Sequence, residues 1–319
     1  MSPVESSGGS PRYPNRDLVL VGPTASGKSQ VAMKLAERHL DAGGLVELIS
    51  GDSMQVYRGM DIGTAKPSVD EQRRVRHHLI DLVEPNEEYS VAEFIPSARA
   101  ALVDIDRRGG RGIVVGGTGL YIQALIDGLE IPGQYPVVRA DLESEADTRL
   151  LHSRLAALDP LGASRMEPDN RRRILRALEV TIGSGRAFSD FGPGLDSFAP
   201  TDFVVVGLDI DRELLSQRIR ERFMQQMADG FLDEVAELQG RGVVPSRTAA
   251  QALGYRELRD HLEGKLGLDE AVELAITRTR QFAVRQIRWF RRDPRIEFFE
   301  QRGDPGELAE RIDRHWRAS

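Results

Sequence analysis

Short apolar runs and amphipathic segments alternate along the first part of the chain. Apolar residues dominate positions 17–21, 45–50 and 113–115, and runs of this length are typical of buried strands. Between them, residues 29–40 and 91–107 carry apolar side chains at helical spacing, and each stretch is followed by a pair of glycines. Strand, helix and strand in alternation predict an α/β fold in which helices flank a parallel sheet.

The pattern changes beyond residue 131. Helical periodicity without a strand signal continues to about residue 184, and a loop rich in Gly, Pro and Ser leads to residue 200. Residues 201–209 are again apolar, and everything after residue 211 has a helical pattern. We therefore expect an all-helical insertion domain within the P-loop core that is described below. The first part of the core is expected at residues 17–131 and the insertion at residues 132–200. The second part of the core, with its helical C-terminal region, follows at residues 201–319.

Composition narrows the classes of protein that fit. A chain of 319 residues suggests two domains, or one core with a large insertion. It has no cysteine, which excludes disulfides, thiolate zinc sites and a cysteine nucleophile. Residues 1–16 are rich in Ser, Pro and Gly without the apolar stretch of a signal peptide, and predict a disordered tail. No apolar run is long enough to span a membrane, so we expect a cytoplasmic protein with no membrane partner.

One segment carries a complete phosphate-binding motif. GPTASGKS at residues 22–29 matches G-x-x-x-x-G-K-[ST] and lies between an apolar strand and a helix. Its glycines let backbone amides turn toward phosphate oxygens, and the helix start adds the positive end of its dipole. The Lys28 ammonium can neutralise phosphate, and the Ser29 hydroxyl can bind Mg²⁺. The predicted phosphate site, an ATP site by its motif alone, is Gly22, Pro23, Thr24, Ala25, Ser26, Gly27, Lys28 and Ser29.

An acidic residue follows the second predicted strand. Nucleotide triphosphatases usually carry one at the end of a later apolar strand, but residues 113–115 here lead into GGTG. Ligands of parallel sheets bind beyond the carboxyl ends of the strands, so the P-loop, Asp52 and Thr118 should face one crevice. Three roles are open for Asp52: a general base, a group that assists Mg²⁺ through water, or a helix cap.

Basic residues are segregated along the chain. The net charge of −7 is unfavourable for a nucleic-acid partner, but it is an average over the whole chain and does not describe local clusters of charge. Seven arginines and one acid lie between Arg278 and Arg295, interleaved with aromatic residues, and four arginines lie between Arg171 and Arg176. Arginine with aromatics suits phosphate contact and base stacking. The alternative is a solvated helix whose aromatics pack into the core, but the second cluster favours RNA or DNA.

Two other classes of enzyme find no support. None of the six histidines has the spacing of a metal site, and the G-x-S-x-G motif is absent. The sequence therefore indicates neither a metallohydrolase nor a serine hydrolase.

Seven segments form an ordered set of motifs. They are GPTASGKS (22–29), SGDSMQVYRGMDIGTAKP (50–67), GGTGLYIQALIDGL (116–129), DNRRRILRALEV (169–180), RIRERFMQQMADGFLDEV (218–235), QALGYRE (251–257) and TRQFAVRQIRWFRRD (279–293). Together they resemble the tRNA dimethylallyltransferases from about residue 17 to residue 293. The combination is far more specific than a P-loop alone.

The resemblance implies a reaction. A dimethylallyl group would pass from dimethylallyl diphosphate to N6 of adenosine 37, in tRNAs that read codons beginning with U, and diphosphate would be released. The P-loop would hold that leaving group in place of ATP. Lys28, the loop amides and Mg²⁺ on Ser29 would stabilise the departing charge. Asp52 would accept the proton of the attacking amine.

The resemblance also implies the partner and its contacts. The tRNA would bind through its anticodon stem-loop, with adenosine 37 flipped into the crevice, and we expect the protein to act as a monomer. Thr118 would line the site, and Arg222, with Arg218 as the second choice, would contact the diphosphate. The implied tRNA contacts are Asp52, Ser53, Met54, Gln55, Thr118, Arg139, Arg172, Arg173, Ile174, Leu175, Arg176, Gln251, Ala252, Leu253, Gly254, Tyr255, Arg256, Val284, Arg285, Gln286, Ile287, Arg288, Trp289, Phe290 and Arg291.

Three rival functions share parts of this pattern. An adenylate isopentenyltransferase would prenylate a free nucleotide, but a mononucleotide needs neither the basic helix nor the helical insertion. A small-molecule kinase would use the P-loop for ATP, yet it does not account for the GGTGLY segment. A nucleotide-switched RNA-binding module without catalysis would leave Asp52 without a role.

Overall fold

The computed structural model describes residues 16–319, which fall into two compact units. The large unit contains residues up to Ile126 and from Pro200 onward, and the small unit is Asp127–Ala199. The disordered tail expected at residues 1–16 lies outside the described residues except for Arg16. The Arg16 side chain donates to the backbone carbonyl oxygens of Asp202 and Phe203, each at 2.8 Å.

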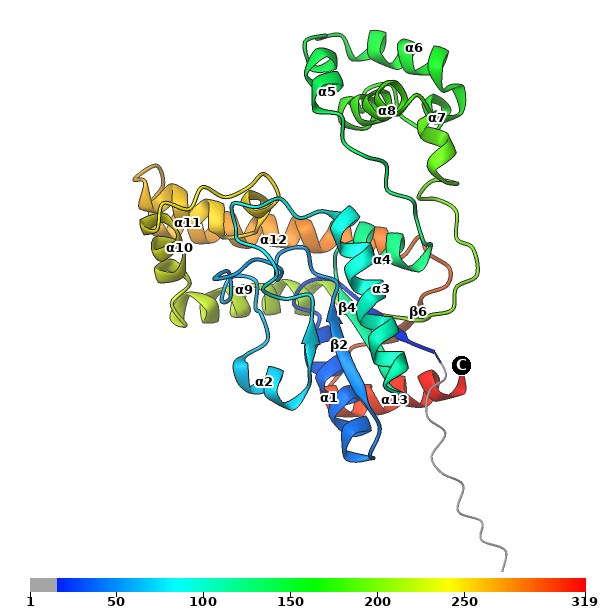
Figure 1. Ribbon diagram of the computed structural model, residues 1–319. Coiled ribbons are helices and arrows are strands. Elements are labelled where there is room, and N and C mark those ends of the chain that lie inside the picture. Colours follow the sequence, from blue (N-terminus) through cyan, green and yellow to red (C-terminus); the bar gives the residue numbers. More distant parts are fainter. Residues whose placement is uncertain (1–15) are drawn as a thin grey trace, which may run out of the picture. The chain divides into compact units, whose positions relative to one another are not determined.

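A parallel sheet forms the centre of the large unit (Figure 1). Its strands are β1 (Leu18–Val21), β2 (Val46–Ser50), β3 (His77–His78), β4 (Arg111–Gly116), β5 (Val204–Asp209) and β6 (Glu297–Glu300). Within residues 16–319 the order is β3-β2-β4-β1-β5-β6, and each neighbouring pair is parallel. In register, Leu18 lies opposite Ile113 on one side and Val204 on the other, so β1 is central. The predicted α/β fold is confirmed.

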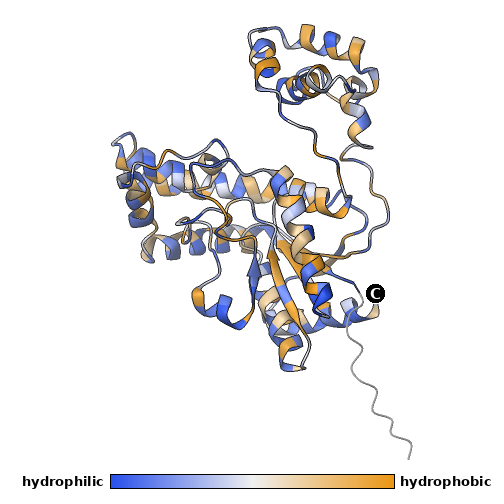
Figure 2. Ribbon diagram, in the orientation of Figure 1, coloured by the Kyte–Doolittle hydropathy of each residue, from blue (hydrophilic) through white to orange (hydrophobic). Residues whose placement is uncertain are grey.

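Some helices of the large unit cover the two faces of this sheet, and others pack mainly on one another. The helices of the large unit are α1 (Lys28–Asp41), α2 (Val69–Arg74), α3 (Val91–Arg107), α4 (Gly119–Ile126), α9 (Arg212–Ala228), α10 (Phe231–Gly240), α11 (Tyr255–Leu262), α12 (Leu268–Phe290) and α13 (Pro305–Ala318), with the 3₁₀ helix η2 (Ala249–Gln251). The helices predicted at residues 29–40 and 91–107 are confirmed. A sheet covered on both faces explains why its strands are continuous apolar runs, and Figure 2 shows that apolar colouring along the strands.

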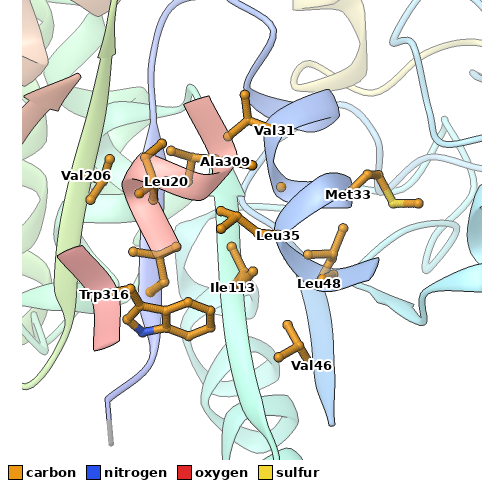
Figure 3. Close-up of a cluster of buried hydrophobic side chains, with 14 of the residues drawn as sticks. Leu20, Val31, Met33, Leu35, Val46, Leu48, Ile113, Val206, Ala309 and Trp316 are labelled. Atoms are coloured by element: carbon orange, nitrogen blue, oxygen red, sulfur yellow. The ribbon is translucent and has the colours of Figure 1, made fainter. Parts of the chain in front are cut away.

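One face of the sheet is covered by α1 and α13. Alternate strand side chains, among them Leu20 and Val206, pack with Leu35 of α1 and Trp316 of α13 in one buried cluster (Figure 3). The opposite face meets α3, where a Cβ on Gly112 would lie 2.5 Å from a methyl carbon of Leu102. Alternation along each strand therefore assigns its side chains to two separate helical layers.

The sheet has an edge strand that the sequence pattern does not reveal. The sequence predicts helices throughout the region after residue 211. The structure instead has a strand there: β6 pairs with β5, with Glu297 opposite Val206 and Glu300 opposite Asp209. β6 has only four residues, Glu-Phe-Phe-Glu, of which three are exposed. An edge strand this short, with an acid at each end, shows neither an apolar run nor a clear alternation.

The small unit is helical. It contains α5 (Pro136–Glu143), α6 (Thr148–Leu158), α7 (Pro160–Ser164), α8 (Arg171–Ser184) and the 3₁₀ helix η1 (Phe188–Phe191). Its own core includes Leu142, Leu155 and Leu178. Asp159 is 2% exposed and caps α7 by accepting from the Gly162 amide at 2.7 Å. In the described part of the chain, no helix has the length and apolar content needed to cross a lipid bilayer.

Candidate active site

A cavity of about 1270 Å³ opens in the large unit beyond the carboxyl ends of the strands. The P-loop contributes Lys28, the segment after β2 contributes Asp52, and α9 contributes Arg218 and Arg222. Parallel strands place the residues that follow them at one edge of the sheet, so segments distant in sequence meet here. The structure thus brings together three of the four residues to which the resemblance gives a catalytic role.

The P-loop has the backbone shape that its glycines permit. Gly27 precedes α1 with φ of 86°, in the left-handed region that glycine adopts without strain. Gly22 has no room for a side chain, since a Cβ there would lie 2.9 Å from Ser26 Oγ and 3.3 Å from the Cβ of Leu208. Ala25 also has a positive φ, 62°. The loop therefore turns tightly between β1 and α1 and leads directly to the amino end of that helix.

Two cations and one carboxylate interact electrostatically in the cavity. Desolvation lowers the pKa of Lys28 to about 8; the carboxylate of Asp52 opposes this shift and the cation of Arg222 adds to it. Desolvation likewise lowers the pKa of Arg222, and Asp52 again opposes the shift. Without an anionic ligand these cations are only partly compensated, so the site is suited to bind an anion such as a diphosphate.

Both arginines considered for the diphosphate lie beside the P-loop. Arg222 donates to Thr24 Oγ1 at 3.4 Å. A Cβ on Gly27 would lie 3.9 Å from a terminal nitrogen of Arg218. Each is one turn from the other on α9, so both guanidinium groups reach the loop from the same side of the helix.

A tight turn orients Asp52. Its Oδ1 accepts from the backbone amide of Met54 at 2.9 Å, and its own amide donates to Ser50 Oγ at 3.3 Å. Ser50 Oγ donates in turn to Gln55 Oε1 at 2.8 Å. The residues after Asp52 form turns, with no helix until α2, so the helix-cap role is removed from the three roles left open by the sequence.

Thr118 lies next to this turn and outside the residues that line the cavity. Its Oγ1 accepts from the Ser53 amide at 3.2 Å and lies 3.4 Å from Ser53 Oγ. The geometry assigns Thr118 to holding the segment after β2 against the turn after β4. Its expected place beside the bound substrate stays a prediction.

The expected tRNA contacts divide into exposed and buried side chains. Arg256, Arg285 and Arg288 are exposed, as is Gln251. A helix has an inner and an outer face, so a contiguous stretch cannot present every side chain to one partner. The buried members of the expected set are Ile174, Leu175, Ala252, Gly254, Tyr255, Gln286 and Phe290.

Several arginines of the small unit have partners within that unit. Arg171 donates to backbone carbonyls near the end of α5, at 3.2 and 3.3 Å. Arg139 and Arg176 each form an ion pair, at 2.7 and 2.9 Å. Arg172 and Arg173 are exposed. Of the basic run on α8, these two are therefore the cations best placed to meet an external phosphate.

The basic helix α12 shows a similar division. Arg278 pairs with Glu257, and Arg291 pairs with Asp209 at 3.0 Å. No acidic side chain of residues 16–319 forms an ion pair with Arg285 or Arg288. Both are exposed, so they are cations of this helix that an external phosphate could reach.

The C-terminal segment adds a residue to the cavity that the sequence does not suggest. Gln301, directly after β6, lines the cavity and is 2% exposed. Its backbone amide donates to the carbonyl of Asp209 at 2.7 Å, and its Nε2 would lie 3.1 Å from a Cβ on Gly27. Its Oε1 has no hydrogen-bond partner among residues 16–319. Oε1 can only accept a hydrogen bond, so the group of Gln301 that is suited to an anionic ligand is the Nε2 donor beside the P-loop.

The donor set determines which metal the site could hold. Ser29 is exposed and lines the cavity. Within residues 16–319, no group of three or more His, Cys, Asp or Glu side chains could hold a metal ion. Mg²⁺ commonly takes one or two protein ligands and completes its sphere with phosphate oxygens and water. The residues present therefore fit a magnesium ion that shares a bound diphosphate with Ser29.

Comparisons with known proteins extend over most of the chain. A sequence model of the family described as IPP transferase matches residues 55–293. A tRNA dimethylallyltransferase of Geobacter metallireducens is 47% identical over 294 residues, covering 90% of this chain and 93% of the relative. One from Kineococcus radiotolerans is 45% identical over 308 residues, covering 94% and 96%.

Solved structures give the same result. The crystal structure of a tRNA isopentenylpyrophosphate transferase from Bacillus halodurans superposes with a TM-score of 0.69 at 37% identity, covering 94% of this chain and 95% of that protein. A eukaryotic dimethylallyltransferase described as acting on tRNA superposes with a TM-score of 0.73 at 28% identity, covering 89% and 73%.

Proposed function

This chain belongs to the IPP transferase family, and from that premise we propose that it transfers a dimethylallyl group from dimethylallyl diphosphate to N6 of adenosine 37 in tRNA. The tRNAs modified are those that read codons beginning with U, and the products are N6-dimethylallyladenosine and diphosphate. The observation that carries the proposal is the meeting of Lys28, Arg222 and Asp52 in one cavity.

The two cations act on the leaving group. As the bond between the allylic carbon and the diphosphate oxygen breaks, negative charge grows on the diphosphate. Lys28 and Arg222, already desolvated, stabilise that charge more strongly than water-exposed groups would. Gln301 adds an amide to the same site, since its side chain lies against the P-loop. Mg²⁺ held with Ser29 would supply further charge neutralisation on the diphosphate.

Asp52 acts on the acceptor. N6 is a weak nucleophile, because its lone pair is partly delocalised into the adenine ring. When it forms its bond to the allylic carbon, the nitrogen would carry four bonds and a positive charge, so it must lose a proton. Oδ1 of Asp52 is held by the Met54 amide at 2.9 Å, so we assign the proton to Oδ2. One carbon–oxygen bond breaks, one carbon–nitrogen bond forms, and the proton passes to the carboxylate.

The tRNA is bound mainly through exposed cations. Arg285 and Arg288 of α12 and Arg172 and Arg173 of α8 are exposed, and guanidinium groups contact phosphates without reading sequence. Adenosine 37 must leave its stack to reach Asp52, which is the usual solution for enzymes that act on a base.

A direct assay tests this proposal. The protein, Mg²⁺ and dimethylallyl diphosphate are incubated with an anticodon stem-loop containing A36-A37-A38, with the same stem-loop carrying G37, or with AMP. Nucleosides are then analysed by mass spectrometry, and we expect N6-dimethylallyladenosine only from the A37 stem-loop. Product from AMP but not from the stem-loop would identify an adenylate isopentenyltransferase. Phosphate transfer from ATP would identify a kinase, and either result would overturn the proposal.

A further inference from the structure

One side chain of the basic helix α12 points into the protein and joins two loops of the active site. Gln286 is 6% exposed, although its sequence neighbour Arg285 is exposed. Its Oε1 accepts from the backbone amide of Thr24 at 2.8 Å, and its Nε2 donates to the carbonyl of Gly117 at 2.8 Å. A single carboxamide thus bridges the P-loop and the turn after β4.

Glycines make this bridge possible. A Cβ on Gly117 would lie 2.3 Å from Nε2 of Gln286, and a Cβ on Gly119 would lie 2.5 Å from the indole ring of Trp289. A larger residue at either of these two positions would push α12 away from the P-loop. Gly117 and Gly119 therefore allow the close approach of α12, whereas a Cβ on Gly116 would meet the backbone of Gly51.

One end of the bridge is Thr24, a residue of the predicted phosphate site. Thr24 uses its amide for Gln286, and its hydroxyl is 3.4 Å from Arg222. Its amide is therefore not directed at a phosphate. Thr24 is instead a fixed point of the loop that leads to residues 25–29.

We infer that Gln286 is a positioning residue for the diphosphate site and not a contact for tRNA. This inference rests on the proposed function. By holding Thr24 and Gly117 at a set separation, Gln286 keeps the P-loop amides and Arg222 arranged for the diphosphate before it binds. The carboxamide that makes both hydrogen bonds is buried, so losing them would leave a buried polar group unsatisfied, which favours the bridged arrangement of the loop.

Steady-state kinetics separates this role from tRNA binding. Gln286→Met removes both hydrogen bonds while keeping a side chain of similar length. We expect the KM for dimethylallyl diphosphate to rise roughly tenfold, as the loss of two hydrogen bonds implies, while the KM for the A37 stem-loop stays unchanged. Arg285→Ala with Arg288→Ala should give the opposite result, a raised KM for the stem-loop alone.

Gln281→Met is the matched control, since Gln281 is exposed on the same helix and should behave as the wild type. Calorimetry of dimethylallyl diphosphate binding without tRNA repeats the comparison without turnover. If Gln286→Met fails to fold, Gln286→Glu serves in its place. It keeps the acceptor for Thr24 but brings a negative charge to the loop, so the same KM should rise.

The outcomes are distinct. A general loss of structure would lower the amount of active enzyme, and hence kcat, without changing either KM. A wild-type protein that transfers no prenyl group would defeat the proposed function whatever Gln286 does. An active wild type whose Gln286 variants keep the donor KM, or lose affinity for the stem-loop instead, would overturn the inference about Gln286.

Discussion

Two aspartates, one in each unit, show how differently a carboxylate can be used. Asp159 of the small unit is 2% exposed and accepts from the Gly162 amide and from both the amide and hydroxyl of Ser189, at 2.7 to 2.8 Å. Asp52 of the large unit faces a cavity, has a hydrogen bond from the Met54 amide, and interacts with two cations.

The surroundings of the two groups explain their different uses. Burial raises the pKa of Asp159, but the bonds from Ser189 and Gly162 outweigh burial and bring its pKa below the usual value. All of its bonds are to its own unit, so its charge stabilises the fold. Asp52 has bonding capacity left for a substrate, and its neighbours are desolvated cations. A satisfied carboxylate stabilises structure, whereas one that faces unsatisfied cations across a cavity is suited to chemistry.

The largest effect should come from Asp52→Asn. Removing the proton acceptor should lower kcat by about 10²- to 10⁴-fold, the usual contribution of a general base. The melting temperature and the affinity for the stem-loop should stay near wild-type values. Asp70→Asn, at an exposed position of α2, is the control. If the Asp52→Asn enzyme had a normal kcat, Asp52 would not be the general base, and the contrast with Asp159 would no longer hold.

Asp159→Ala should act on stability instead. It leaves the Gly162 amide and two donors of Ser189 without their acceptor, at a cost of about 3 kcal/mol. In denaturant unfolding, the small unit should unfold at a lower denaturant concentration than in the wild type. The kcat measured at a saturating concentration of stem-loop should change little. A variant that is stable but inactive would contradict the structural role of Asp159.

Gln301→Ala tests the C-terminal contribution to the cavity. A hydrogen bond to a charged group is worth about 2 kcal/mol, so the KM for dimethylallyl diphosphate should rise by more than about tenfold. Arg302→Ala, at the exposed neighbouring position, should leave it unchanged. Equal behaviour of the two variants would remove Gln301 from the site.

The pH dependence of donor binding tests the Lys28 ammonium. Its pKa in the free protein is about 8, and bound diphosphate raises it further. Well below pH 8, Lys28 is protonated with and without ligand, so Lys28 itself adds no pH dependence to the affinity there. Above pH 8 the free protein loses a proton that the complex keeps, and calorimetric affinity should fall by at most about tenfold per pH unit. Lys28→Met should bind more weakly and lack this decline.

The smallest effect should come from the exposed arginines of the small unit. Arg172→Ala with Arg173→Ala should weaken stem-loop binding and lower its salt slope by about 2, because each arginine would neutralise about one phosphate. The kcat should not change. Arg149→Ala with Arg154→Ala, also exposed on this unit, is the control pair. An unchanged salt slope would mean that Arg172 and Arg173 do not contact the tRNA phosphates.

Local signals made much of this fold predictable from the sequence. The P-loop, the strand before it and the acid after β2 each depend on a few adjacent residues, and the structure brings Lys28, Asp52 and Arg222 to one cavity. The apolar strands are equally local, because burial on both faces requires continuous apolar runs.

Features set by distant partners were not predictable. β6 is recognisable only beside β5, and Gln301 reaches the P-loop only because β6 lies there. Arg172, Arg173 and Arg176 of α8 were predicted as tRNA contacts, but Arg176 pairs with Glu179 within the small unit. The face of α12 that carries Gln286 is buried because it packs against the glycines of a turn that is far away in the sequence.

The order of strands also has a consequence for how the chain folds as it is synthesised. β1 emerges first, yet its neighbours β4 and β5 are Arg111–Gly116 and Val204–Asp209, and α13, at the very end, packs against α1. The small unit is one continuous segment with local contacts, and such contacts form early and fast. We therefore expect the small unit to fold before the core around Trp316, which can close only once α13 has been synthesised.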